Sequence, residues 1–252
     1  MEGLPVMEPA KPIFPQERFG RVYIPNPGSL RYPLREVQGR PRQGVGVWPS
    51  TKTWRMGRYQ KYQDQGQTSH CVRYGSTHIL LLEPIVRAHA LTLTAGLYQW
   101  AQANDPWPGQ EPEYFGTSVD AGLQYLLHQA KVIKEYRWAL TMDDIIKRLS
   151  ASARDGGGPM IVGTDFYSGM DVEVPSGEEP DSRTKWVPEG EVLGGHCYVL
   201  DAFRQRTAHR EKQIGIGNSH KGNHRGWMDA DAMEWLIFGQ NGECAAITEL
   251  PK

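Results

Sequence analysis

The chain has 252 residues, enough for one substantial hydrophobic core or two closely packed lobes. Its 28 Lys and Arg balance 29 Asp and Glu, so it lacks the excess positive charge that nucleic-acid binding usually requires. The densest apolar run, residues 79–86, is interrupted by Glu83 and Pro84 and is far shorter than the ~20 residues of a membrane span. We therefore expect a soluble protein with neither nucleic acid nor membrane as a partner.

The N-terminus and the cysteines indicate where the protein works. The chain begins Met-Glu-Gly-Leu-Pro, which is acidic and proline-containing where a signal peptide is basic and then apolar. The three cysteines, Cys71, Cys197 and Cys244, form neither a CxxC pair nor an even-numbered disulfide framework. This pattern predicts no signal peptide and a reduced compartment, where each cysteine is a buried core thiol or a nucleophile.

The first half of the chain predicts an extended segment followed by helices. Residues 1–45 are rich in Pro, Arg and Gly and show no regular period, so we expect an N-terminal extended arm before a catalytic domain of residues 46–252. Apolar spacing predicts a helix over Cys71–Leu82, which Pro84 ends. A second helix is expected over residues 88–103.

Two further helices are predicted from their capping residues. Thr117 or Ser118 can cap a helix that starts at residue 119, and its apolar residues repeat at helical spacing. Thr141 and Asp144 are spaced as a capping box for a helix that extends to Ala153.

After Pro159 the pattern changes to short apolar runs typical of strands. The expected strands are Met160–Thr164, His196–Phe203, Gln213–Asn218 and Cys244–Thr248. Between them, the polar segment Val174–Gly190 is expected to be a solvated loop, or alternatively a flap that selects substrate. Helices followed by strands indicate an α+β fold with two lobes, in which a cleft between the lobes is the natural site.

Cys71 has the strongest chemical context of the three cysteines. It follows a glycine-containing loop and begins a predicted helix, whose partial positive charge favours the thiolate. A nucleophilic cysteine also needs a base, a group that orients the base and a donor to the oxyanion. His196 opens a predicted strand behind two glycines, and Asn218 ends a strand that can bring its amide to the imidazole. These residues are therefore candidates for base and orienting group.

This arrangement resembles the papain-like cysteine peptidases, especially their compact bacterial and viral relatives. Four segments carry the resemblance in family order: the Asp-Gln-Gly loop before Cys71, Gly-Thr-Ser at 116–118, Gly-Gly-His-Cys-Tyr-Val-Leu at 194–200, and Asn-Ser-His to Gly-Trp at 218–227. His196 and Asn218 follow Cys71 at separations close to the family's roughly 130–150 residues. The resemblance implies a papain-like two-lobe fold with a helical N-terminal lobe and a sheet-rich C-terminal lobe.

The resemblance also implies residue roles. Cys71, His196 and Asn218 match the catalytic triad, and Gln65 matches the glutamine of the oxyanion hole. Where the family has a tryptophan over the Asn–His hydrogen bond, this chain has His220, so the shield must come from another residue or be absent. The implied activity is hydrolysis of peptide bonds in a peptide or protein substrate, without a cofactor.

Several alternatives compete with this interpretation. Cys71 and His196 can each be structural residues, and Cys197 and Cys244 are expected to be core thiols, as Trp235, Ile237 and Phe238 are expected to be packing residues. A zinc site at the two His-Cys dipeptides with His220 and His224 is disfavoured, because neighbouring strand residues point to opposite faces and the usual ligand spacing is missing. No metal is therefore expected.

Three functions remain open from the sequence. The same Cys–His pair can serve acyl transfer or isopeptide cleavage instead of peptide hydrolysis. Alternatively, the fold can serve as a structural or assembly module, for example in a virus particle, with the arm of residues 1–45 gripping a protein partner. The expected location is the cytoplasm or a virion.

Overall fold

The computed structural model describes residues 20–22, 34, 51–58, 60–106, 111–112, 114–172, 184–206, 211–220 and 225–249. Its helices are α1 (Cys71–Leu81), α2 (Ala90–Leu93), α3 (Leu97–Asn104), α4 (Val119–His128), α5 (Met142–Ser150) and α6 (Ala230–Glu234). Its strands are β1 (Lys52–Thr53), β2 (Ile133–Trp138), β3 (Met160–Tyr167), β4 (Val192–Arg206), β5 (Glu211–Gly217), β6 (Arg225–Asp229) and β7 (Glu243–Glu249).

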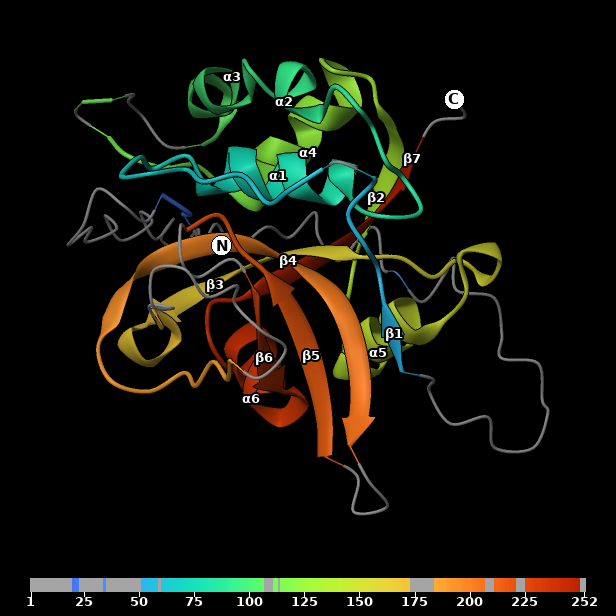
Figure 1. Cartoon of the computed structure of the whole chain (residues 1–252). Helices are drawn as coiled ribbons and strands as arrows, with labels where there is room; N and C mark the ends of the chain where they lie inside the picture. The colour runs from blue at the N-terminus through green and yellow to red at the C-terminus, as the bar shows by residue number, and fades with distance from the viewer. Residues whose placement is uncertain are drawn as a thin grey trace, which may run out of the picture.

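One antiparallel sheet organises the described residues, with strand order β2-β7-β3-β4-β5-β6 and β1 paired to β4. Helices α1–α4 lie together over one part of the sheet, while α5 and α6 lie on the other side (Figure 1). We call α1–α4 the helical half, and β3–β7 with α5 and α6 the sheet half. The predicted α+β fold, with helices and sheet segregated in this way, is confirmed.

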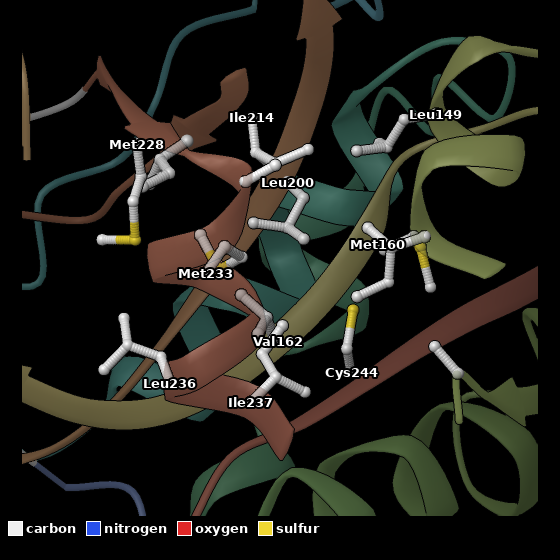
Figure 2. Packing of buried hydrophobic residues seen from close by; sticks show 14 of the residues in the cluster. Leu149, Met160, Val162, Leu200, Ile214, Met228, Met233, Leu236, Ile237 and Cys244 are labelled. Carbon is white, nitrogen blue, oxygen red and sulfur yellow. The ribbon is translucent and has the colours of Figure 1, made fainter. Parts of the chain in front are cut away.

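Alternation along the central strands produces two cores. Ile161 and Cys197 face the helical half, whereas their neighbours Val162 and Tyr198 face the sheet half. Figure 2 shows the sheet-half core, in which Val162 packs with residues of β4, α6 and the segment after α6. Cys197 and Cys244 are both fully buried, in the helical-half and sheet-half cores respectively, as expected of core thiols.

The predicted helix ends are largely confirmed. The helix expected over Cys71–Leu82 spans Cys71–Leu81. Ser118, rather than Thr117, caps α4 by accepting a hydrogen bond from the N–H of Ala121. Both hydrogen bonds of the Thr141–Asp144 capping box are present, but α5 ends at Ser150. A separate 3₁₀ turn at Ala153–Asp155 follows it.

The single helix expected over residues 88–103 is wrong, because the chain forms the two helices α2 and α3 there. The break falls at Thr94, whose buried hydroxyl lies 2.7 Å from the hydroxyl of Thr77 in α1. Strands β2 and β6 were also not predicted. Each is short and lies at an edge of the sheet, where a strand carries only a weak apolar pattern.

Two expectations about packing need correction. Ile237 is buried, but Trp235 and Phe238 are 41% and 38% exposed, because the chain leaves α6 through a π-helical turn that points them outward. The polar segment Val174–Gly190 was expected to be solvated throughout. Its described part contains Trp186, which is fully buried with its ring 5.6 Å edge-on to Phe166. The remainder of that segment lies outside the described residues.

The predicted boundary near residue 45 also lies outside the described residues. Of the predicted arm, Gly20–Val22 and Leu34 are described, and Gly20–Val22 contact both halves of the molecule. In the part of the chain that the structure describes, no helix combines the length and apolarity needed to cross a membrane.

Candidate active site

Cys71 is the first residue of α1 and is fully buried. Helix α1 packs closely on β4, since a Cβ at Gly75 would lie 2.7 Å from the sulfur of Cys197. The backbone of Cys197 also hydrogen-bonds to the Cys71 thiol. The start of α1 therefore lies beside the strand that carries His196, one residue before Cys197.

His196 and Asn218 are hydrogen-bonded to each other, with 2.7 Å between His196 Nε2 and Asn218 Oδ1. The same Oδ1 accepts the backbone N–H of Ser219 at 2.8 Å, which identifies it as the amide oxygen. An amide oxygen can only accept, so Nε2 of the imidazole is the protonated nitrogen. The basic lone pair of a neutral His196 ring is then on Nδ1.

Two aromatic rings cover this hydrogen bond. The ring of His220 stacks on that of His196 with 4.4 Å between centroids and 27° between planes. Phe166 approaches His196 edge-on at 4.9 Å. His196, Asn218 and His220 are all nearly or fully buried. The shield that the sequence left in question is therefore present, formed by Phe166 and by His220 itself.

Gln65 is buried and lies in the loop before α1. Its side-chain oxygen accepts the hydroxyl of Ser219 at 2.5 Å, and its backbone N–H donates to the Ser219 carbonyl at 2.8 Å. Its side-chain nitrogen donates to the carbonyl of Thr68 at 2.7 Å. Ser219 thus connects the Gln65 loop directly to Asn218, its neighbour in sequence.

The thiol of Cys71 is not activated in this conformation. Burial raises the pKa of this thiol to about 11. Hydrogen bonds from the backbone of Cys197, Gly20 and Val72 and the charge of Arg21 favour the thiolate, but they offset only part of the effect of burial. Gly20 belongs to the predicted arm, far from Cys71 in sequence, and a Cβ on it would overlap the carbonyl of Ser69. The protein's own N-terminal segment therefore covers the thiol.

This segment, Gly20–Val22, will be called the interlobe segment (the short dark-blue trace between α1 and β4 in Figure 1). Its backbone bonds to both halves of the molecule. Gly20 O accepts the N–H of Thr117 at 2.7 Å, and the N–H of Val22 donates to Thr117 O at 2.9 Å. The N–H of Arg21 donates to Gly195 O at 2.9 Å, immediately before His196.

The structure thus joins His196 to Asn218 directly and Gln65 to Asn218 through Ser219, and it brings the Cys71 thiol to the backbone beside His196. Sequence reasoning did not find Gly20, Arg21, Ser219 or Glu243, which bonds to Arg21. An isolated arginine or glutamate carries no spacing signal. Among the described residues, no three or more His, Cys, Asp or Glu side chains are grouped to hold a metal ion, and His224 of the zinc alternative lies outside the described residues.

No protein-family model matches the sequence, and no curated protein matches it. Solved structures do resemble the fold. The procathepsin L2 proteinase of Tenebrio molitor larval midgut aligns with a TM-score of 0.55 at 12% identity, covering 92% of this chain and 79% of that one. Procathepsin L 3 of the same beetle gives a TM-score of 0.51 at 10% identity, covering 92% and 76%.

The proform of the Amb a 11 cysteine protease, a major ragweed pollen allergen, gives a TM-score of 0.51 at 12% identity, covering 89% of this chain and 74% of that one. At these identities the likeness shows the fold, which is papain-like over most of the chain. The expectation of a compact bacterial or viral relative has no counterpart among these structures and stays a hypothesis.

Proposed function

We infer that the chain is a cysteine peptidase in a covered, latent conformation. Cys71 is the nucleophile, His196 the base, Asn218 the group that orients the base, and Gln65 a donor to the oxyanion. The observation that carries this proposal is the hydrogen bond of 2.7 Å between His196 and Asn218. His196 lies on β4, and the backbone of the next residue, Cys197, hydrogen-bonds to the Cys71 thiol. The papain-like fold of the chain supports it.

The proposed reaction follows from the tautomer of His196. Nδ1 takes the proton of the Cys71 thiol, and the sulfur forms a bond to the substrate carbonyl carbon. The second N–H of the Gln65 amide and the backbone N–H of Cys71 stabilise the oxyanion. The C–N bond then breaks as the imidazolium gives its proton to the leaving amine. Water, deprotonated by His196, hydrolyses the thioester and regenerates the thiol.

The covered thiol also supports a second candidate function. A permanently covered Cys71, fully buried and with a raised pKa, fits a structural or assembly protein that keeps the fold without catalysis. Acyl transfer or isopeptide cleavage uses the same first step as hydrolysis. Product analysis with and without an added amine distinguishes it from hydrolysis.

The deciding experiment measures hydrolysis of fluorescently labelled, unfolded casein by the full chain carrying Arg21→Glu. This change places a second carboxylate beside Glu243, and the repulsion should expel the interlobe segment. We expect hydrolysis in this variant, and a loss of about 10⁴-fold or more on adding Cys71→Ala or His196→Ala. Arg154→Glu, the same charge change at an exposed arginine, should leave the wild-type rate unchanged.

Three results would count against the peptidase. Equal hydrolysis with and without Cys71 would remove it as nucleophile. Equal hydrolysis with and without His196 would remove the base. Complete inactivity of a folded Arg21→Glu chain, as judged by near-ultraviolet circular dichroism, would favour the structural module.

A further inference from the structure

Arg21 is the most unusual residue of the interlobe segment, because its long charged side chain is almost completely buried. It is 2% exposed, and its Nε and Nη2 donate to the Oε1 of Glu243 at 3.3 and 3.1 Å. Glu243, at the start of β7, has a side chain that is only 12% exposed. A buried arginine needs such a partner, because removing either charge leaves the other uncompensated.

Four residues from different elements enclose the Arg21 side chain and will be called the Arg21 site: Gly163, Val119, Gly195 and Glu243. A Cβ at Gly163 would lie 2.7 Å from Arg21 Nε and 2.8 Å from the Cγ2 of Val119, so only glycine leaves room for the guanidinium there. A Cβ at Gly195 would overlap the Arg21 carbonyl and lie 3.3 Å from its Cδ. Gly163 also pairs with Glu243 across β3 and β7, which places the acid beside this opening.

The interlobe segment is held through its backbone, with glycine required at position 20, where a Cβ would overlap the carbonyl of Ser69. Its three hydrogen bonds to Thr117 and Gly195 use only main-chain groups, which any extended peptide can supply. Gly20 at the same time hydrogen-bonds to the Cys71 thiol. Residues 20–22 are therefore placed as a bound peptide would be, with backbone contacts giving affinity and one side-chain site available for selection.

We propose that Glu243 determines specificity by selecting an arginine side chain in the peptide that lies beside Cys71, with Arg21 as the protein's own occupant of that site. The proposal rests on the peptidase function inferred above and names its substrate class: peptides with arginine close to the bond that is cleaved.

Electrostatics favour a guanidinium over an apolar side chain at this position. Burial raises the pKa of Glu243, while the charge and hydrogen bonds of Arg21 lower it. Burial likewise raises the pKa of Asp165, and Arg21 lowers it, so a second carboxyl acts on the same cation. An apolar side chain would leave the Glu243 carboxylate buried without its cation, which is a strong basis for rejection.

Arginine also fits better than lysine. Both Nε and Nη2 of Arg21 reach one carboxylate oxygen, a geometry that a planar guanidinium provides and a single ammonium nitrogen does not. The intramolecular segment competes with any such substrate at a high effective concentration, in the millimolar range for a short tether. The Arg21 site must therefore be emptied before its preference can be measured.

The first test measures binding, so that its result does not depend on catalysis. The full chain carrying Arg21→Ala is titrated with propylguanidinium, and its thermal unfolding midpoint is followed. We expect a saturable rise with propylguanidinium and none with propylurea, its neutral analogue. Wild type, whose site is filled, and Arg21→Ala/Glu243→Gln should not respond. If Arg21→Ala is unfolded, the same comparison is read as refolding by propylguanidinium but not propylurea.

The second test uses peptidyl acyloxymethyl ketones that react with Cys71 in the Arg21→Ala chain, with arginine or its neutral analogue citrulline at each of the two positions nearest the reactive group. We expect arginine to accelerate labelling by about tenfold or more over citrulline at one position, corresponding to about 1.4 kcal/mol. Glu243→Gln should bring that ratio close to one.

The outcomes separate the two proposals. Saturable propylguanidinium binding without any labelling of Cys71 keeps the arginine site and contradicts the peptidase function. Labelling that is equal for arginine and citrulline contradicts the role of Glu243 and leaves the peptidase intact. The arginine site is also overturned if propylurea acts as well as propylguanidinium, or if neither does.

Discussion

The two sides of the candidate site are built differently. On the sheet half, the contacts are between side chains. Asn218 bonds to His196, and the rings of Phe166 and His220 cover the bond. At the start of the helical half, backbone groups surround the Cys71 thiol, and one of them comes from Gly20 of the N-terminal segment. One side holds a hydrogen-bonded imidazole, while the other has its thiol covered by backbone groups.

This difference teaches that the orientation of the His196 ring and the accessibility of the Cys71 thiol are set by different parts of the fold. The His196–Asn218 pair lies on β4 and in the turn that follows β5, and its hydrogen bond is made by side chains of those two segments. The state of Cys71, in contrast, depends on the interlobe segment, whose Gly20 and Arg21 act on the thiol. We therefore expect variants that change one side without changing the other.

Apart from the Cys71–His196 pair itself, the largest expected effect in an uncovered chain comes from Gln65, the residue that links the two sides. In the Arg21→Glu background, Gln65→Ala should lower kcat by roughly 10²–10³ with a smaller change in KM, because an oxyanion donor acts mainly in the transition state. Steady-state kinetics on a peptide substrate measures this.

Gln65→Glu provides a matched control, since it keeps the size and the oxygen that accepts from Ser219 but removes the amide donor. It should lose kcat as the alanine variant does. A pure KM effect in both variants would assign Gln65 to substrate binding. A loss of activity in Gln65→Ala alone would show that the contact with Ser219 is what matters.

Much of the sheet half could be predicted from the sequence, because its signals are local. His196 follows two glycines at the start of one β-type run, and Asn218 ends another. Once the two strands are recognised, the place of each side chain in the sheet can be predicted. The order of helices and strands gave the α+β class for the same reason. The thiol at the first turn of a helix was likewise readable from its loop and from Pro84 after the helix.

The closed side could not be predicted, because its contacts join segments far apart in sequence. Arg21 lies in a Pro- and Arg-rich stretch without a period, and Glu243 begins a strand whose core residues follow it. Nothing in either pattern indicates that they form an ion pair. The sequence therefore indicated an activated Cys71, whereas burial raises its pKa to about 11 against the hydrogen bond from Gly20, which lowers it.

The second prediction tests whether the covering segment causes that raised pKa. A raised pKa lowers the thiolate fraction at a given pH, so alkylation of wild-type Cys71 should be slow at pH 7 and should accelerate up to about pH 11. Arg21→Glu should shift this profile to lower pH and raise the rate at pH 7 by at least roughly 100-fold, since even an unpaired thiol with a pKa near ~8.5 has far more thiolate there.

Iodoacetamide labelling followed by peptide mapping measures this separately for each cysteine. Burial also raises the pKa of Cys197 and Cys244, which lie in the two cores and should stay slow in both chains. Adding His196→Ala to Arg21→Glu should slow Cys71 again, because the imidazolium partner is lost. If Cys197 or Cys244 reacts first, or if Arg21→Glu leaves Cys71 unchanged, the interlobe segment does not control the thiol.

The smallest expected effect concerns His220, which acts on His196 without contacting substrate in this proposal. Its ring stacks 4.4 Å from that of His196, so His220→Ala should admit water to the His196–Asn218 hydrogen bond and weaken the orientation of the base. In the Arg21→Glu background we expect about a tenfold loss of kcat with KM nearly unchanged, corresponding to roughly 1.4 kcal/mol.

His220→Trp, which keeps a covering ring, should restore most of the rate, whereas a merely structural role would make the larger ring no better than alanine. His128→Ala, at an exposed histidine on α4, should have no effect. If His220→Ala and His220→Trp lose activity equally, the stacked ring is not what positions His196, and the contacts from Phe166 at 4.9 Å and Tyr198 at 6.0 Å become the candidates.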